Sequence, residues 1–277
     1  MRNAAARWML GAAAAFCLAT PVLAQGEAKG RVVSLDQCAD QYVLALAPRG
    51  DIAGLSRRAD DADSWLRNQA EGLPLRRVSA ESVLVARPTL VVRYWGGDTR
   101  MDAMLQRRGV RTVRIDEASD FNGVRANIRK VAAALDQPAK GEALIADMDK
   151  KLNAAQGRWR GAGALYLTPG GFTAGRGTLI DSMLAAAGLT NLASKPGYSP
   201  VPLESLAFKT PAAFVLGFFD ALENAMERWA PGRHRVIQRR LKGRAVASLP
   251  GSMLGCPAWF AADGALDIAR ARPKTGP

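Results

Sequence analysis

Two glutamates stand at matching places in the two halves of the chain. Glu81 begins "ESVLVARPTLVV" and Glu204 begins "ESLAFKTPAAFVL", and in each case a proline seven residues further on opens an apolar strand. A carboxylate in such a position could form an ion pair with an arginine of a partner, or it could interact favourably with the dipole at the start of its own helix. One such match could arise by chance. Because the two glutamates stand in corresponding strand–helix units of the two halves, however, the match predicts that they lie at equivalent points on two similar lobes.

A glycine-rich loop, "TPGGFTAGRGTLID", follows a predicted strand and precedes a predicted helix, which is the context of a phosphate-binding loop. Counted from Gly170, however, Gly175 is followed by Arg176 and Gly177 where a P-loop has Lys and Ser or Thr. We interpret the loop as a structural turn or a ligand-facing loop. The planar side chain of Arg176 could still bind a carboxylate or another anion.

Catalytic side chains are scarce. The single histidine, His234, lies in the basic stretch "GRHRVIQRRL", which is typical of a solvated helix. Cys256 could act as a nucleophile, but no neighbouring base is apparent. Because no cluster has the spacing of metal ligands either, we expect a binding protein that uses no cofactor and is not an enzyme.

Aromatic side chains give a stronger indication of function. They fall near the ends of predicted strands or in the loops that follow, at Trp65, Tyr94, Trp95, Phe172, Tyr198, Phe218 and Phe219. Open α/β sheets bind ligands at the carboxyl ends of their strands. Any one of these rings could belong to the core, but as a set they predict a cleft for a large, flat or hydrophobic ligand.

The elements that would position these residues alternate between short apolar strands and amphipathic helices, which predicts an α/β fold with parallel sheets. We expect an N-terminal α/β lobe at residues 25–119, a bridging helical segment at 120–158 and a C-terminal α/β lobe at 159–277. Asp120 suits a helix N-cap, and Pro138 suits a restart of the helix after a kink. About 20 residues of helix would span about 30 Å, enough to join two lobes.

Residues 1–24 have the features of a cleaved secretory signal: Arg2 and Arg7, an apolar run from Trp8 to Leu18, and the ending "VLA". The alternative, a membrane anchor, is disfavoured because the apolar run is far shorter than the ~20 residues that cross a bilayer. Phe16 before Cys17 argues against a lipoprotein. The localisation predicted from this segment is the periplasm.

Removing this segment leaves 36 of the 38 basic side chains against 25 acidic ones, a net charge of about +11. Such a balance favours anionic ligands or surfaces, but no basic run of the nucleic-acid-binding kind is present, so we expect no nucleic acid partner. The remaining cysteines, Cys38 and Cys256, could form a disulfide in an oxidising compartment, or they could be free or buried thiols.

The chain resembles the periplasmic binding proteins of ABC importers for vitamin B12, ferric siderophores and haem. The resemblance rests on several stretches in a fixed order: "RVVSLDQCADQYVLALAPRGDIAGLS", "ESVLVARPTLVV", the long central helix, "TLIDSMLAAAGLTNLA" and "PLESLAFKTPAAFVL". It implies two Rossmann-like lobes bridged by one long α-helix, with the ligand in the cleft between them. A stiff helix at this place implies modest closure on ligand binding rather than a wide hinge motion.

The resemblance also implies roles for individual residues. Glu81 and Glu204 would dock into arginine pockets of the membrane permease, which works with an ATPase. Trp65, Tyr94 and Trp95 would face the cleft from the first lobe, and Phe172, Tyr198 and Phe218 from the second.

We therefore expect a monomeric receptor that captures a metal chelate, either cobalamin, a ferric siderophore or haem, and delivers it to an importer. Two alternatives stay open. One is an exported α/β enzyme that uses the loop from Gly170 to Gly177, and the other is a sensory binding module that does not serve transport.

Overall fold

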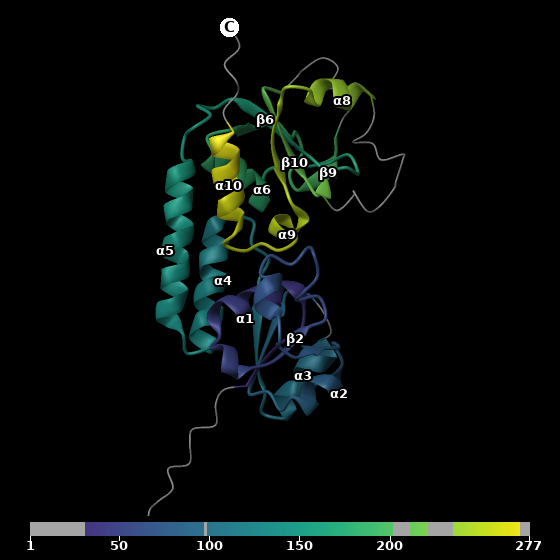
Figure 1. Ribbon diagram of the computed structural model, residues 1–277, viewed down its shortest axis with the longest axis vertical. Coiled ribbons are helices and arrows are strands. Elements are labelled where there is room, and N and C mark those ends of the chain that lie inside the picture. Colours follow the sequence, from purple (N-terminus) through teal and green to yellow (C-terminus); the bar gives the residue numbers. More distant parts are fainter. Residues whose placement is uncertain (1–30, 97–98, 202–210, 221–234, 272–277) are drawn as a thin grey trace, which may run out of the picture.

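The computed structural model describes residues 31–96, 99–201, 211–220 and 235–271. Within these ranges the chain folds into two α/β lobes that are joined along one side by helices (Figure 1). This is the predicted fold class. The expected secretory signal at residues 1–24 lies outside the described residues, as do His234 and Glu204. No helix in the described ranges has the length and apolar character that crossing a bilayer requires.

The N-lobe contains a parallel five-stranded sheet with the order β3-β2-β1-β4-β5. Its strands are β1 (Val32–Ser34), β2 (Ile52–Ser56), β3 (Leu75–Arg76), β4 (Leu90–Tyr94) and β5 (Arg111–Ile115). The central strands are buried apolar runs, as expected for a parallel sheet that is covered on both faces. The helices of this lobe are α1 (Gln37–Leu46), α2 (Ala80–Val85) and α3 (Thr99–Arg107), with short 3-10 turns at Arg49–Asp51 and Arg67–Ala70.

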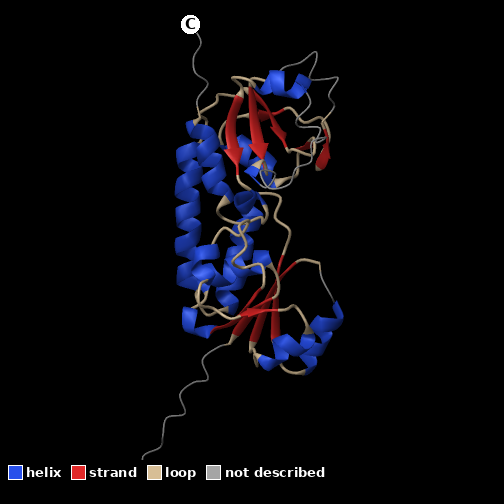
Figure 2. Ribbon diagram, turned by 45° about the vertical axis from the view of Figure 1, so that its right-hand side comes forward, coloured by secondary structure: helices blue, strands red, loops and turns tan. Residues whose placement is uncertain are grey.

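The C-lobe contains a second parallel sheet, of four strands, with the order β11-β10-β6-β8. These strands are β6 (Gly163–Leu167), β8 (Thr190–Asn191), β10 (Ala213–Gly217) and β11 (Ala245–Leu249). A separate antiparallel pair, β7 (Phe172–Ala174) and β9 (Tyr198–Pro200), lies beside it. The helices are α6 (Leu179–Ala186), α8 (Arg235–Leu241), α9 (Gly251–Leu254) and α10 (Ala261–Arg270). Figure 2 shows the two sheets well separated, with helices along one side.

The long helical tract between the two sheets is a helical hairpin rather than one kinked helix. α4 (Phe121–Ala134) begins at Asp120, the predicted N-cap, which accepts a hydrogen bond from the Gly123 amide. After α4 the chain reverses at Asp136, which has a positive φ of 56°, and α5 (Pro138–Ala155) runs back antiparallel to α4. The predicted kink at Pro138 is therefore wrong, although the proline does begin a helix, because a left-handed residue just before it turns the chain around.

α5 alone spans both lobes. Its first half packs on α4, where Gly141 lies against Ala132. Its second half packs on α10, where Lys151 forms an ion pair with Asp263 at 3.0 Å. With 18 residues, α5 is about 27 Å long. One long bridging helix, as predicted, thus belongs to the cores of both lobes.

A second connection joins the lobes at residues 255–260, a segment that we call the strap. The strap leads from α9 to α10 and lies against α1 of the N-lobe (Figure 1). The Tyr42 hydroxyl donates a hydrogen bond to the Pro257 carbonyl at 3.1 Å, and the Tyr42 ring packs edge-on against Trp259 at 5.3 Å. Phe260 of the strap stacks on the ring of Trp65 in the N-lobe. The strap and α5 together hold the two lobes in a fixed relation.

Asp40 is a fully buried carboxyl group that ties α1 to the sheet. It accepts hydrogen bonds from Ser34 Oγ, from the Ser56 amide at 2.9 Å and from Ser56 Oγ at 2.5 Å. Burial raises the pKa of Asp40 to about 6 in spite of these hydrogen bonds. Because the folded state holds this proton more tightly than the unfolded state, the contribution of Asp40 to stability is greatest at acidic pH and falls as the pH rises through about 6.

We expect the substitution Asp40→Asn to expose this effect, since asparagine cannot ionise. Between pH 4 and pH 7 the free energy of unfolding of the wild type, minus that of Asp40→Asn, should fall by about 2 kcal/mol. Urea unfolding of both proteins over this pH range would measure the difference. If the difference in free energy of unfolding between the two proteins stayed constant with pH, the pKa of Asp40 would not be raised in the folded state.

Candidate functional site

A cavity of about 410 Å³ lies between the two lobes. The N-lobe contributes residues that follow the carboxyl ends of β4 and β5, and the C-lobe contributes the start of α6, strand β9, helix α9 and the strap. Ligands of open α/β sheets bind at this kind of edge, because the loops there differ in length and composition without disturbing the sheet. The position of the cavity agrees with the predicted cleft between the lobes.

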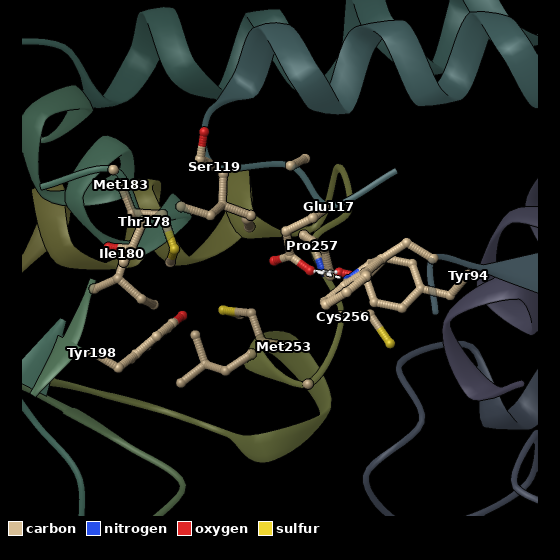
Figure 3. A pocket seen from close by; sticks show the side chains of 17 residues that line it. Tyr94, Glu117, Ser119, Thr178, Ile180, Met183, Tyr198, Met253, Cys256 and Pro257 are labelled. Atoms are coloured by element: carbon tan, nitrogen blue, oxygen red, sulfur yellow. Dashed lines mark hydrogen bonds between the residues drawn. The ribbon is translucent and has the colours of Figure 1, made fainter. Parts of the chain in front are cut away.

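The N-lobe wall of the cavity is built on Tyr94, Trp95 and Glu117. Tyr94 and Glu117 lie close together in Figure 3. The Tyr94 hydroxyl and Trp95 Nε1 both donate hydrogen bonds to the same oxygen of Glu117, Oε2. Burial and the neighbouring Glu117 carboxylate raise the pKa of Tyr94, so its hydroxyl stays protonated and acts as a donor. These hydrogen bonds hold two aromatic rings and one carboxylate in a single arrangement.

Asp36 fixes the backbone beneath this wall. One of its carboxylate oxygens caps α1 by accepting from the Ala39 amide at 2.8 Å, and the other accepts from the Tyr94 amide at 2.7 Å. Burial raises the pKa of Asp36, while hydrogen bonds from backbone amides oppose the rise. Asp36 therefore ties the end of β4, which carries Tyr94, to the first turn of α1.

The C-lobe wall is formed mainly by Tyr198, Met183, Met253 and Thr178. Tyr198 reaches into the cavity from the side opposite Tyr94, with Met183 beside it and Met253 between the two tyrosines (Figure 3). Trp95 and Tyr198 are 54% and 68% exposed, so each leaves most of its surface free. Exposed aromatic rings on both walls are suited to binding a large planar ligand.

A second cavity, of about 450 Å³, adjoins the first on the N-lobe side. The two share Tyr94, Trp95 and Gly255, so the aromatic pair forms the partition between them. Arg58 and Arg93 line the second cavity, but each is already paired with carboxylates: Arg93 with Asp102, and Arg58 with residues of the loop after β2.

Among the described residues that line the first cavity, Glu117 is the one charged side chain, and none is cationic. The interior of this site thus differs in charge from the strongly basic chain as a whole. Groups of three or more His, Cys, Asp or Glu side chains that could hold a metal ion are not found in the part of the chain that the structure describes.

Cys38 and Cys256 form a disulfide, with their Cα atoms 5.3 Å apart. Of the possibilities that the sequence left open, this is the one that the structure shows. Cys38 lies in α1 and lines the second cavity, while Cys256 lies in the strap and lines the first. The bond therefore joins the two lobes directly beside the cleft.

Other aromatic residues that were expected at the cleft lie elsewhere. Trp65 stacks on Phe260 of the strap, with ring centroids 5.2 Å apart, so it packs at the junction of the lobes. Phe172 is exposed on β7 and does not line either cavity. Phe218 is half-buried with a positive φ of 63°, and its ring faces Gly251 at the start of α9.

The second half of the glycine-rich stretch, residues 175–178, forms the turn between β7 and α6. Thr178 caps α6, and its hydroxyl donates a hydrogen bond to the Gly175 carbonyl at 2.7 Å. A Cβ atom at Gly175 would lie 1.8 Å from the carbonyl oxygen of Lys195, so this close approach of two backbones requires glycine. Arg176 is exposed and does not line the cavity, whereas Gly177 does. The loop is thus a structural turn with one end at the cleft.

Glu81 is exposed in the first turn of α2, beside the N-cap Ser79. Hydrogen bonds with its own backbone N–H and with Ser79 lower the pKa of Glu81, so the carboxylate is ionised at neutral pH. Val85, one turn further along the same face of α2, is 75% exposed. This face of α2 therefore offers a negative charge next to an apolar side chain.

Glu117 and Met253 were not singled out from the sequence. Glu117 could have been found, because "VRIDEASD" places it two residues after the end of a predicted strand, where the carboxyl-edge rule applies. Met253 had no such signal, since it reaches the cavity from a four-residue helix that the pattern did not predict.

The fold and the site define a two-lobed binding protein with its ligand cleft between the lobes. Residues 32–217 match the model of the family described as "Periplasmic binding protein", and the chain belongs to this family. Its members bind solutes and are not enzymes. A comparison with curated protein sequences gives no match.

Several solved structures share this fold. A periplasmic haem-binding protein from Pseudomonas aeruginosa is 27% identical, with a TM-score of 0.66 over 89% of this chain and 94% of that one. The haem-binding protein HutB of Vibrio cholerae is 19% identical, with a TM-score of 0.70 over 87% and 98%. The vitamin B12-binding protein BtuF of Vibrio cholerae is 18% identical, with a TM-score of 0.63 over 87% and 95%.

Proposed function

We propose that this protein is the periplasmic ligand-binding component of an ABC importer, and that it captures a metal chelate and delivers it to the membrane permease. The observation that carries the proposal is the cleft itself, which Tyr94 and Trp95 of one lobe and Tyr198 of the other line together. Rigid aromatic faces on both sides suit a planar macrocycle. The related structures named for haem and vitamin B12 support the same class of ligand.

The described lining favours a chelate with a neutral or amide-bearing periphery. Glu117 accepts hydrogen bonds, and no cation among the described lining residues is available to a carboxylate. A porphyrin with ionised carboxylates would place negative charge near Glu117, at a cost in free energy, whereas amide N–H groups would complement it. Cobalamin is therefore our first choice of ligand, ahead of haem and ferric siderophores.

The test is a titration of the purified protein with cobalamin, haemin and several ferric siderophores, followed by tryptophan fluorescence and by the absorbance of the chelate. Saturable binding of one chelate with a one-to-one stoichiometry is expected. Binding of none of them would contradict the proposal, and tightest binding of haemin would overturn the choice among ligands while leaving the class intact.

We further propose that Glu81 and Glu204 dock on the permease. The exposed, ionised Glu81 supports this role, and Glu204 is its counterpart in the repeat. Exposed ion pairs are individually weak, so this pairing would set register and encounter rate more than affinity.

Replacing both glutamates with arginine is expected to reduce uptake of the chelate by at least about 10-fold, because two attractive contacts become repulsive, while ligand affinity stays within about twofold of the wild type. Uptake by cells and binding by purified protein would be measured in parallel. The matched control is Glu71→Arg, at another exposed N-lobe glutamate. Normal uptake by a double variant that still binds the chelate would refute docking through these two glutamates.

A further inference from the structure

The amino-terminal edge of the N-lobe sheet carries an unusual concentration of arginine. Parallel strands begin at the same edge of a sheet, and here Arg31 directly precedes β1 while Arg111 begins β5. The Thr89 amide donates a hydrogen bond to the Arg31 carbonyl at 2.9 Å, and the Arg111 amide donates to the Thr89 carbonyl at 3.1 Å. Residues that start three neighbouring strands are therefore in direct contact.

Further arginines lie just before other strands of this sheet. The full set, which we call the arginine edge, is Arg31, Arg49, Arg87, Arg107, Arg108 and Arg111. All are exposed. The same edge also carries the carboxylates Asp51 and Asp136, which follow Arg49 and α4 respectively, so arginine remains in clear excess.

The positive charge of the arginine edge is not neutralised within the protein. No ion pair in the described ranges joins any of these arginines to a carboxylate. Three of them are held by backbone carbonyls instead: Arg31 Nε donates to Ala86 at 2.8 Å, Arg49 Nη1 to Gln69 at 2.6 Å, and Arg111 Nη2 to Ala134 at 3.3 Å. These hydrogen bonds orient the guanidinium groups while leaving their charge intact.

The arginine edge faces away from the ligand site. The cleft lies at the carboxyl ends of the same strands, whereas Arg87 precedes β4 at the opposite edge. A partner on the arginine edge would therefore leave the cleft accessible.

We propose that the arginine edge is a docking surface for anionic phospholipid headgroups. Clustered guanidinium groups bind phosphate by charge-assisted, bidentate hydrogen bonds, and basic surfaces are attracted to anionic bilayers. Such docking would keep the receptor near the membrane that holds its permease.

The test measures binding of the exported protein to lipid vesicles by sedimentation. The amino terminus of the protein is first verified by mass spectrometry. Vesicles of phosphatidylcholine alone are compared with vesicles that also contain phosphatidylglycerol. The variant is Arg87→Gln combined with Arg107→Gln and Arg108→Gln. The matched control removes the same charge elsewhere, with Gln at Arg57, Arg158 and Arg160, which are also exposed.

We expect binding to the vesicles that contain phosphatidylglycerol only. The arginine-edge variant should bind them on the order of 100-fold more weakly, because each basic residue at the surface contributes several-fold, and the control should change far less. An equal loss in both variants would show a general effect of net charge and would overturn the proposal, as would an absence of binding by the wild type.

Two further measurements make the outcome unambiguous. Circular dichroism and the thermal midpoint of the arginine-edge variant should match those of the wild type, because the substituted side chains are exposed. Sodium phosphate and sodium chloride at equal ionic strength should release the protein from vesicles equally. Much stronger release by phosphate would identify a site for the free anion and would contradict a lipid-docking surface.

Discussion

Replacing Cys38 and Cys256 with serine is expected to lower the free energy of unfolding by about 3–5 kcal/mol and the thermal midpoint by roughly 10 °C. The disulfide closes a loop of 218 residues, and in the chain-entropy account such a long loop greatly restricts the unfolded state. Calorimetry or urea unfolding of the double variant and of the wild type would measure the loss.

Repeating the unfolding experiment with a reductant distinguishes the contribution of the disulfide from that of side-chain packing around the two substituted positions. Wild-type protein treated with a reductant should match the double variant, and reductant should not change the double variant further. If the unfolding midpoint of the wild type were the same within error before and after reduction, the disulfide would not stabilise the junction of the lobes. Because Tyr42 and Trp259 still pack across the junction, the reduced protein should keep its fold at moderate temperature.

Replacing Trp95 or Tyr198 with alanine is expected to weaken binding of the chelate by roughly 30-fold or more. Both rings are largely exposed and line the cavity from opposite lobes, so a planar ligand would bury them. Fluorescence or absorbance titration with the chelate that binds the wild type would measure the affinities.

Phe172→Ala provides the matched control for these variants. Phe172 is another exposed aromatic residue, 47% accessible, but it lies on β7 outside the cavity. Its substitution should leave the affinity within about twofold of the wild type, as expected for a surface position. If Phe172→Ala weakened binding as much as Trp95→Ala, the ligand would occupy a different surface from the one described.

The sequence was sufficient to predict the fold class because parallel α/β sheets have a strong pattern. Buried runs such as that of β4, separated by amphipathic helices, allow few other arrangements. Asp120 identified the start of α4 because a side-chain cap is a local interaction. The reversal between α4 and α5 was missed because it depends on a left-handed Asp136, a conformation that a non-glycine residue rarely signals in sequence.

The candidate site was predictable only in part. Tyr94 and Trp95 follow directly from the end of a strand, so their place at the cleft could be inferred from the chain order. Trp65 could not be placed in this way, because its partner Phe260 is nearly 200 residues away and long-range packing leaves no local signal. The pairing of Glu117 with both aromatic residues is likewise a product of tertiary structure.

The most direct test of the central claim is a crystal structure of the protein with the chelate that it binds, recorded at an X-ray energy where the metal scatters anomalously. We expect one strong anomalous peak between the lobes, beside Trp95 and Tyr198. A peak at any other place, or none in crystals that visibly retain the coloured chelate, would contradict the assignment of this cleft as the binding site.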